Sequence, residues 1–351
     1  MSKKRFAAGV LAALVAFAAL AVTLAGSVSA KPKAAKATFL AALVSDVGRF
    51  NDKSFNQSQL AGLNRAKRVL KIRTLPIQSN NTSDYVPNLT TAVRRGSGLV
   101  IAAGFLMAPS LKDLAPQFPK THFAITDDFV SSSVGDFKGA DVHNIEGLTY
   151  ATQENSYLIG CLAAMVAKSK YKGTPTIGVV GGIKIPPVDT FLAGYRAGAK
   201  KCVRNSVVKI GYSQDFVKQD LCKNVAEDEI ASGAKIIFGV AGLCGLGALN
   251  AAKEHGLFAI GVDQDQSFLG PHILTSAVKR VDNGVFLAIK NAKAGKFKGG
   301  SNVVYNLKNN GVALGKFSPR LKGPILKQVK AKVATLRKQI ISGKIKPPTN
   351  V

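Results

Sequence analysis

The folded part of the chain begins with Thr38-Phe39-Leu40-Ala41-Ala42-Leu43-Val44-Ser45, which is followed at once by Asp46-Val47-Gly48. A short run of this kind, apolar almost throughout, is typical of a strand that is buried on both faces of a sheet. The polar turn leads into a helix-like stretch at residues 55–70. Strand, turn and helix in this order form the repeating unit of α/β proteins. We therefore expect this run to be the first strand of a parallel sheet.

The same unit recurs along the rest of the chain. Further strands are expected in short apolar runs at residues 99–103, 122–126, 176–180, 207–212, 235–240, 258–262 and 273–278. Helices are expected between and after them at residues 86–95, 108–118, 149–168, 190–204, 216–232, 245–254, 282–294 and 324–342. This alternation predicts an α/β fold of parallel sheets flanked by helices, with right-handed crossovers.

One stretch indicates where the chain passes between two lobes. A weak, polar strand candidate at 141–145 precedes an unusually long helix at 149–168. We expect an N-terminal lobe at residues 37–148, with part of about 274–302, and a C-terminal lobe at residues 149–273, with about 303–351. The stretch 302–314 has the pattern of a hairpin.

Residues 1–30 have the pattern of a signal peptide. They combine the basic start Lys3-Lys4-Arg5, an apolar stretch at 6–25 and the small residues Val28-Ser29-Ala30 at the expected cleavage point. An uncleaved membrane anchor is the alternative, because about 20 apolar residues can span a bilayer. No cysteine stands at the cleavage point, so a lipobox lipoprotein is not expected, and residues 31–36 have the composition of a flexible tether. We expect an exported protein, soluble in the periplasm or at the exterior of the cell envelope.

The chain is strongly basic. Its 351 residues include 48 Lys and Arg against 20 Asp and Glu, a formal net charge of +28, while 46% hydrophobic residues indicate an ordinary packed protein. Such an excess suits an anionic partner or a basic exterior. The lysines are scattered, without interleaved aromatic residues and without a recognition-helix, zinc-finger or single-strand-binding motif. A solvated basic surface is therefore favoured over a nucleic-acid site.

Carboxylates follow three of the expected strands. Asp46 follows the first strand, the pair Asp127-Asp128 follows the third, and Asp263 follows the strand that ends at Val262. Ligands of open parallel sheets bind beyond the carboxyl ends of the strands. Carboxylates there suit a ligand with hydroxyl or amine donors better than a phosphate, which prefers backbone NH groups, Lys and Arg. Each aspartate could instead cap the helix that follows it.

The remaining chemistry gives little support to an enzyme. Phe55 and Phe191 stand near helix starts, where a ring can stack on a planar ligand or belong to the core. The glycine run at 242–247 reads GxxGxG and not the dinucleotide pattern GxGxxG, and no P-loop is present. No nucleophile stands with a base, and the four cysteines and four histidines show no ligand spacing. We therefore expect no cofactor, no metal and no catalytic activity.

Ordered motifs run through nearly the whole chain after the signal peptide. They are LVSDVG at 43–48, NDKSFNQ at 51–57, SDYVPNL at 83–89, GFLM at 104–107, FAITDD at 123–128, GG at 181–182 with IP at 185–186 and FLAGY at 191–195, AG at 241–242 with GLG at 245–247, IGVDQDQ at 260–266, LTSAVKRVD at 274–282 and ISGKI at 341–345. In this order they resemble the basic membrane protein (BMP) family, also called PnrA-like, whose members are substrate-binding proteins of bacterial ABC importers and bind nucleosides, purine ones in particular.

The resemblance implies a two-lobe periplasmic-binding-protein fold of the first type that closes on its ligand by hinge motion. Carried over by position, the ligand-binding residues are Asp46, Asn51, Phe55, Asp127, Asp128, Phe191, Gly242, Asp263 and Lys279. Within this set the resemblance gives Asp46 and the pair at 127–128 to the base, Phe55 and Phe191 to its two faces, and Gly242, Asp263 and Lys279 to the ribose. Lys279 would also neutralise Asp263, which otherwise would be costly to bury.

The function that the resemblance implies is delivery of a nucleoside to an ABC permease in the membrane by a monomeric binding protein. Two alternatives remain at this point. One is an exported enzyme that processes nucleosides, against which the missing catalytic residues argue. The other is a nucleoside-sensing receptor component, which would share the ligand and differ only in its partner.

Export permits disulfides, and geometry favours one pairing of the four cysteines. Cys222 is expected about two turns into a helix, and Cys244 follows the next strand, so the two can approach each other at one edge of the sheet. Cys161 and Cys202 stay unassigned. Four buried free thiols are the alternative, since cysteine is often buried without a bridge.

Overall fold

The structure, a computed structural model, describes residues 38–351. The predicted signal peptide at 1–30 and the predicted tether at 31–36 lie outside the described residues. Among the helices of residues 38–351, none combines the length and the apolar character that crossing a bilayer would require.

The first sheet contains six parallel strands. In spatial order they are β11 (Asn302–Tyr305), β5 (Ile145–Tyr150), β4 (His122–Thr126), β3 (Leu99–Ala103), β1 (Leu40–Ser45) and β2 (Arg73–Ile77). Strand β1, which has no exposed residue, lies inside the sheet and is covered on both faces, as its apolar sequence predicts. Strand β2 lies at the edge of the sheet, where a proline such as Pro76, which has no N–H to donate, is tolerated.

The second sheet also has six strands. In spatial order they are β12 (Val312–Leu314), β10 (Ile273–Lys279), β9 (Phe258–Asp263), β8 (Ile236–Val240), β6 (Thr176–Gly181) and β7 (Val207–Tyr212). All neighbours are parallel except β12, which pairs antiparallel with β10. Both sheets therefore have the doubly covered, parallel character that the sequence predicts.

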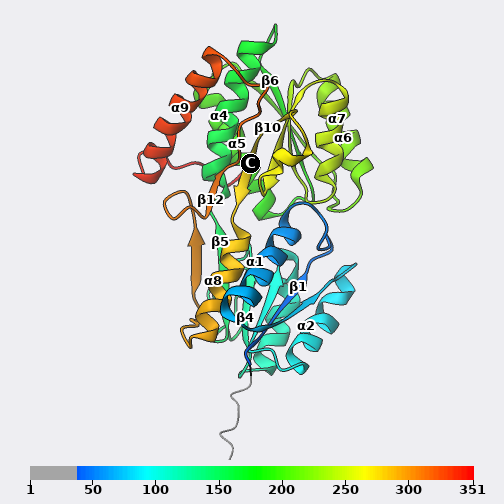
Figure 1. Cartoon of the computed structure of the whole chain (residues 1–351), viewed down its shortest axis with the longest axis vertical. Coiled ribbons are helices and arrows are strands. Elements are labelled where there is room, and N and C mark those ends of the chain that lie inside the picture. Colours follow the sequence, from blue (N-terminus) through cyan, green and yellow to red (C-terminus); the bar gives the residue numbers. More distant parts are fainter. Residues whose placement is uncertain (1–37) are drawn as a thin grey trace, which may run out of the picture. The chain divides into compact units, whose positions relative to one another are not determined.

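Helices cover both faces of each sheet (Figure 1). They are α1 (Phe55–Leu70), α2 (Tyr85–Arg94), α3 (Ala108–Leu114), α4 (Thr152–Lys170), α5 (Pro186–Cys202), α6 (Gln219–Ala231), α7 (Gly245–Glu254), α8 (Val281–Lys293) and α9 (Pro324–Ile341), with short 3₁₀ turns η1 (Thr82–Asp84), η2 (Phe105–Met107), η3 (Ala115–Gln117) and η4 (Gln266–Leu269). Helix α8 packs on α1, and α9 packs on α4. We call the first sheet with α1, α2, α3 and α8 the first lobe, and the second sheet with α4 to α7 and α9 the second lobe.

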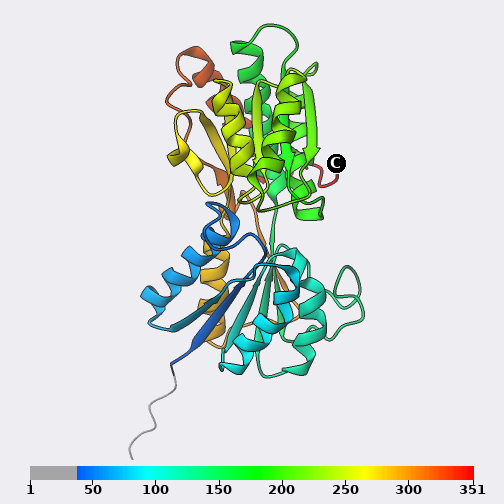
Figure 2. The same cartoon turned by 90° about the vertical axis from the view of Figure 1, so that its right-hand side faces the viewer.

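Three segments of chain cross between the lobes. They lead from β5 to α4, from β10 to α8 and from β11 to β12, and they lie side by side in the middle of Figure 2. Hydrogen bonds tie them together: Ala151 N donates to Tyr305 O at 2.8 Å, and Arg280 N donates to Gly311 O at 2.9 Å. The stacked rings of Tyr150 and Tyr305, 4.9 Å apart, add a rigid contact. These crossings are where a hinge between the lobes would bend.

The prediction of parallel sheets flanked by helices is confirmed, but the last crossings differ from the expectation. Strand β10, expected with the N-terminal lobe from residue 274 on, pairs with β9 in the second sheet, so the chain returns to the first lobe only after Lys279. The hairpin expected at 302–314 is wrong, because β11 pairs with β5 while β12 pairs with β10. Two short apolar runs separated by a turn have the same sequence pattern whether they pair with each other or with other strands.

Two disulfides join elements of the second lobe. Cys222 on α6 is bonded to Cys244, whose Cα is 5.5 Å away, so the structure contains the bridge that the sequence left open. The two unassigned cysteines, Cys161 on α4 and Cys202 at the end of α5, form the other bridge, with a Cα separation of 5.2 Å. The Cys222–Cys244 bridge fixes the loop between β8 and α7, which also carries Gly242.

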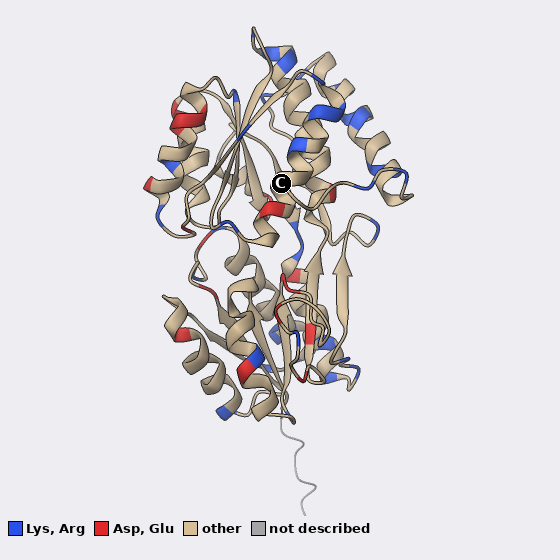
Figure 3. Ribbon diagram, turned by 180° about the vertical axis from the view of Figure 1, so that it is seen from behind, with Lys and Arg blue, Asp and Glu red and all other residues tan. Residues whose placement is uncertain are grey.

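Lysine and arginine residues are spread over helices and loops around both sheets (Figure 3). After Asp282 the sequence contains no further Asp or Glu, so α9 and the segments beside it are basic without an acidic partner on the same stretch. The excess of positive charge is therefore a property of the exterior.

We expect the double substitution Cys222→Ser and Cys244→Ser to lower the free energy of unfolding by about 3 kcal/mol, because the bridge closes a loop of 22 residues in the unfolded chain. Urea unfolding measures this loss. The matched pair Cys161→Ser and Cys202→Ser, with a loop of 41 residues, should lose slightly more. Peptide maps of unreduced protein should contain a fragment that joins Cys222 to Cys244. Complete labelling of all four thiols in unfolded, unreduced protein would contradict both bridges.

Candidate functional site

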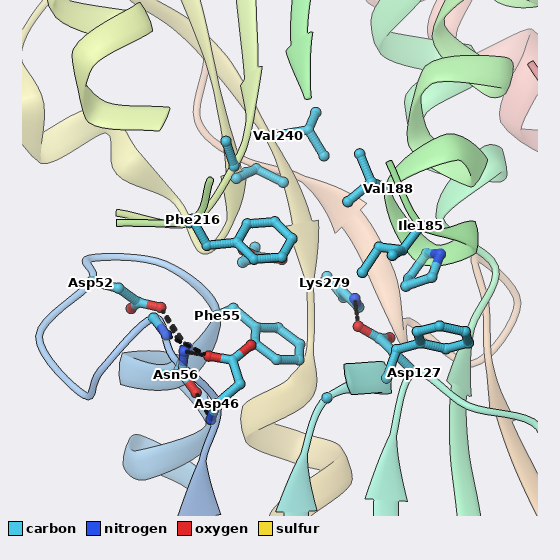
Figure 4. Close-up of a pocket in the computed structure, with 18 of the residues that line it drawn as sticks. Asp46, Asp52, Phe55, Asn56, Asp127, Ile185, Val188, Phe216, Val240 and Lys279 are labelled. Carbon is cyan, nitrogen blue, oxygen red and sulfur yellow. Dashed lines mark hydrogen bonds and ion pairs between the residues drawn. The ribbon is translucent and has the colours of Figure 1, made fainter. Parts of the chain in front are cut away.

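A cavity lies between the lobes, where the carboxyl ends of strands from both sheets meet (Figure 4). Ligands of open parallel sheets bind at such edges. The lining residues are Asp46, Gly48, Asp52, Phe55, Asn56, Gly104, Phe105, Leu106, Asp127, Ile185, Pro187, Val188, Phe191, Phe216, Val240, Ala241, Gly242, Val262, Asp263 and Lys279. Apolar side chains thus form most of the walls, and four carboxylates with one lysine supply the charges.

Asp46 and Asp52 are joined by one asparagine on the first-lobe side. Asn56 Nδ2 donates to Asp46 Oδ1 at 2.6 Å and to Asp52 Oδ2 at 3.2 Å. Asp46 Oδ1 also accepts from Gly48 N at 2.8 Å. Within residues 38–351 no donor reaches the other oxygen, Asp46 Oδ2, which lies beside the ring of Phe55. That oxygen is therefore free to accept a hydrogen bond from a ligand.

Asp52 organises the start of α1. Its carboxylate accepts from the backbone N–H groups of Ser54, Asn56 and Gln57 at 2.8, 2.8 and 3.0 Å. These are donors that the first turn of a helix leaves without intrahelical partners, and a carboxylate there also interacts well with the helix dipole. The sequence analysis did not single out Asp52, although an aspartate three residues before the first helical residue is the signal that could have found it.

Lys279 crosses from the second lobe to the first. Its ammonium forms an ion pair with Asp127, and it lies 4.9, 5.3 and 5.6 Å from the ring centres of Phe55, Tyr150 and Phe191. Only 3% of its surface is exposed. Lys279 was expected to neutralise Asp263, but its direct partner is Asp127. Lys279 acts on Asp263 only through its electrostatic field, which lowers the pKa of the Asp263 carboxyl.

Asp263 is held from the opposite lobe. Ser54 Oγ, at the start of α1, donates to Asp263 Oδ2. No other hydrogen bond reaches this carboxylate among the residues that the structure describes, so its second oxygen is available to the cavity. Asp127 and Asp263 both have positive φ, 71° and 64°, which is uncommon for residues other than glycine. Backbone strain of this kind concentrates at binding sites, where it aims a side chain.

Burial controls the protonation of the cavity carboxylates. It raises the pKa of Asp46 to about 7, against the lowering effect of its bonds from Asn56 and Gly48. It raises the pKa of Asp263 to about 6, against the field of Lys279. Burial likewise raises the pKa of Asp127 and of Asp52. A ligand that donates hydrogen bonds to these oxygens would replace the lost water and favour the ionised forms.

Two aromatic rings face each other across the cavity, and one of them differs from the expectation. Phe55 on α1 and Phe216 in the loop before α6 project into the cavity from opposite lobes (Figure 4). Phe191 also lines it, but only 3% of its surface is exposed and its ring meets that of Phe238 edge-on at 6.2 Å. In the sequence, residue 216 stands at an expected helix start, and nothing there indicates a role in the cavity. Gly182 makes the space, because a Cβ there would lie 2.3 Å from the Phe216 ring.

Seven of the nine predicted site residues line the cavity: Asp46, Phe55, Asp127, Phe191, Gly242, Asp263 and Lys279. Asn51 and Asp128 are not among the lining residues. Asn51 is exposed in the turn before α1. Asp128 accepts from Phe129 N and lies near Asp136, and burial raises its pKa to about 7. The chain turns at Asp127, whose φ is 71°, and of the pair Asp127-Asp128, Asp127 lines the cavity.

The lining residues that the sequence analysis missed are Asp52, Asn56, Phe216 and the apolar wall around Ile185 and Val188. Apolar residues after a strand give no signal of their own, because they resemble core residues. Within residues 38–351, His, Cys, Asp and Glu form no group that could hold a metal ion.

Comparisons with known proteins match nearly all of residues 38–351 to one family. The family described as "ABC transporter substrate-binding protein PnrA-like" matches residues 39–350. An "ABC transporter nucleoside-binding protein BmpA" from Lactococcus lactis subsp. cremoris is 33% identical, with 99% of each chain covered. "Basic membrane protein A1" from Borrelia garinii subsp. bavariensis is 34% identical, with 86% of each chain covered.

Solved structures show the same architecture. A solute-binding protein of an ABC transporter system from Aeropyrum pernix K1 has a TM-score of 0.77 and 27% sequence identity, covering 89% of this chain and 93% of that chain. The expected fold, a two-lobe periplasmic-binding-protein fold of the first type, is thereby confirmed.

The protein should lose stability as the pH rises from about 4 to about 7. The pKa of Asp46 is about 7 in the folded state against an ordinary value of 3.8, so the folded state binds a proton that the unfolded chain releases in this range. This contribution is fully present below pH 3.8 and is lost as the pH rises through 7. Asp46→Asn should therefore flatten the pH profile of the free energy of unfolding, measured by urea titration.

A second variant separates this effect from general burial. Glu229→Gln removes a buried carboxyl on α6, outside the cavity, whose pKa burial raises to about 8. Glu229→Gln should make the free energy of unfolding less dependent on pH up to about pH 8. The loss of stability that Asp46 causes between about pH 4 and 7 should remain. A profile of Asp46→Asn that superimposes on that of the unsubstituted protein would contradict the assignment.

Proposed function

Because the chain belongs to the PnrA-like family of ABC transporter substrate-binding proteins, we propose that it binds a purine nucleoside in the cavity between its lobes and delivers it to a permease in the membrane. The observation that carries the proposal is the pairing of two facing phenyl rings with free carboxylate oxygens in one cavity. A nucleoside offers a flat base for the rings and donors for the carboxylates.

The ribose half would bind at the second-lobe side. The free oxygen of Asp263 can accept from the hydroxyls of a ribose diol, and such charge-assisted hydrogen bonds are among the stronger ones. Gly242 lines the same cavity and has φ of 55°, a conformation that disfavours a side chain, and the absence of a side chain leaves its backbone accessible to a ligand. Lys279 lies between Asp127 and the three rings and supplies the positive charge on which this part of the site depends.

The base half would bind between Phe55 and Phe216. Asp46 Oδ2 lies close to the edge of the Phe55 ring, near Gly104, where it can accept from a ring N–H or amino group of a stacked base. Gly104 has φ of 128°, and a Cβ there would lie 3.3 Å from that oxygen and 3.4 Å from the ring. The absence of a side chain at this position therefore keeps the plane beside Phe55 open for a base.

The charge of the cavity favours nucleosides over their phosphates. Asp46, Asp52, Asp127 and Asp263 face one lysine, which Asp127 already engages. A phosphate brought into this space would meet carboxylates at short range and little positive charge to offset its desolvation. Membership of the family supports delivery to a permease, which requires export, and a signal peptide at 1–30, as predicted, would provide for export.

Purine nucleosides should be the tightest ligands. Calorimetry with inosine and guanosine should give higher affinities than with cytidine, because two rings bury more of a bicyclic base and stacking contributes about 1–3 kcal/mol per base. Adenine, ribose and inosine 5′-monophosphate should bind more weakly than inosine, and inosine should be recovered intact after incubation. Preference for cytidine or for ribose alone would refute the ligand class, and release of free base would identify an enzyme.

Loss of one stacking face should weaken nucleoside binding selectively. Phe216→Ala should lower the affinity for inosine about ten- to hundredfold, since stacking on an aromatic side chain contributes about 1–3 kcal/mol. Its melting temperature should change little, because the ring is only half-buried. The control Phe268→Ala removes an exposed ring that does not line the cavity, and it should bind inosine as the unsubstituted protein does. Equal affinities in both variants would remove Phe216 from the site.

A further inference from the structure

We propose that Ser54 and Gln266 form a clasp between the lobes that holds the closed form over the cavity, and that both are positioning residues for the bound ligand. Two hydrogen bonds define the clasp. Ser54 Oγ of the first lobe donates to Asp263 Oδ2 of the second, and Gln266 Nε2 of the second lobe donates to Lys53 O of the first at 2.8 Å. The role in ligand retention rests on the proposed function, but the clasp itself can be tested without a ligand.

The Gln266 side chain is held in place by its own lobe. Its Oε1 accepts from Val262 N at 2.9 Å, and its backbone N donates to Ser276 Oγ at 3.0 Å. Gly261 provides the room, since a Cβ there would lie 2.5 Å from Gln266 Oε1. Only 1% of the Gln266 surface is exposed, and the remaining polar group of its side chain, Nε2, donates to the other lobe. A preset donor loses little conformational entropy when the lobes close.

The acceptor side of the clasp is equally fixed. Asp52 accepts from the N–H groups of Ser54, Asn56 and Gln57 and thereby holds the turn that leads into α1. Lys53 adopts φ of 55°, a left-handed conformation that is uncommon for a residue with a side chain. This strained turn presents Lys53 O and Ser54 Oγ to the second lobe. Strained backbone conformations persist where the surrounding contacts hold them, and they concentrate at functional sites.

Asp263 connects the clasp to the cavity. One oxygen accepts from Ser54, and the other is open to the cavity. A hydroxyl group that binds the open oxygen orients the whole carboxylate, and it favours the ionised form, which is the better acceptor for Ser54. Ligand binding and lobe closure therefore strengthen each other through one side chain.

The clasp lies away from the crossings, so opening must break it. In the first sheet β3 and β4 separate β1, whose following turn carries the clasp, from β5 and β11, where the chain crosses between the lobes. A rotation about the crossings moves the turn after β1 away from Asp263 and Gln266. Each hydrogen bond contributes modestly to such an equilibrium, so removing both should shift the ratio of open to closed protein by roughly ten- to hundredfold.

Small-angle X-ray scattering of the ligand-free protein tests the clasp directly. The variants are Ser54→Ala, which removes one donor, and Gln266→Glu, which keeps the acceptor for Val262 N and replaces the donor to Lys53 O. The double variant should have a larger radius of gyration than the unsubstituted protein. Ser318→Ala is the matched control, because Ser318 is also buried but its hydroxyl bonds to Pro271 O within the second lobe. It should scatter as the unsubstituted protein does.

Inosine release supplies the second readout. In the double variant its dissociation rate should rise at least tenfold while its association rate changes little, because the broken bonds exist only in the closed form. Identical scattering of the double variant and the unsubstituted protein would overturn the clasp, whatever the ligand. If the unsubstituted protein failed to bind inosine, the proposed function would fail while the scattering result still decided the clasp.

Discussion

The burial of carboxylates at the ends of strands is the constraint on which the rest of the structure depends. Asp46, Asp127 and Asp263 come from two different sheets, and within residues 38–351 Lys279 is the one lysine that lines their cavity. One cation and a few hydrogen bonds do not offset the loss of water around so many carboxylates, and their pKa values rise for that reason. Hydroxyl and N–H donors of a ligand would offset this cost, so the cavity suits molecules rich in such groups.

Because the cavity carboxylates come from both sheets, their burial couples the two lobes. Two carboxylates of the cavity have a partner in the opposite lobe: Asp127 of the first lobe pairs with Lys279 of the second, and Asp263 of the second accepts from Ser54 of the first. For these two strand ends, the partner comes from the other sheet. In the proposed binding protein, closure, carboxylate ionisation and ligand contact would consequently favour one another, and the crossings beside Tyr150 and Tyr305 are where the hinge would bend.

Sequence patterns predicted most of the fold and part of the site, for identifiable reasons. The apolar strands and the carboxylates after them stand out because burial on both faces and a polar strand end are local properties. Phe216 gave no signal in the sequence, because a ring in a loop becomes significant only when Gly182, just after strand β6, leaves room for it. The choice of Asp127 over Asp128 depends on which way the chain turns after β4, and the destination of β11 and β12 depends on sheet partners. These are tertiary facts that no local pattern contains.

The charge of the chain divides between an acidic cavity and a basic exterior, and the two act over different ranges. Exposed charges are screened within about 10 Å at 0.1 M salt, so the exterior influences which molecules approach and how fast. With a net charge of +28, that influence favours anions, nucleoside phosphates among them. The charged residues that line the cavity are Asp46, Asp52, Asp127 and Asp263, together with Lys279, which is already paired with Asp127. For the proposed nucleoside ligand, the exterior would therefore work against discrimination from nucleoside phosphates, and that discrimination would depend on the buried carboxylates.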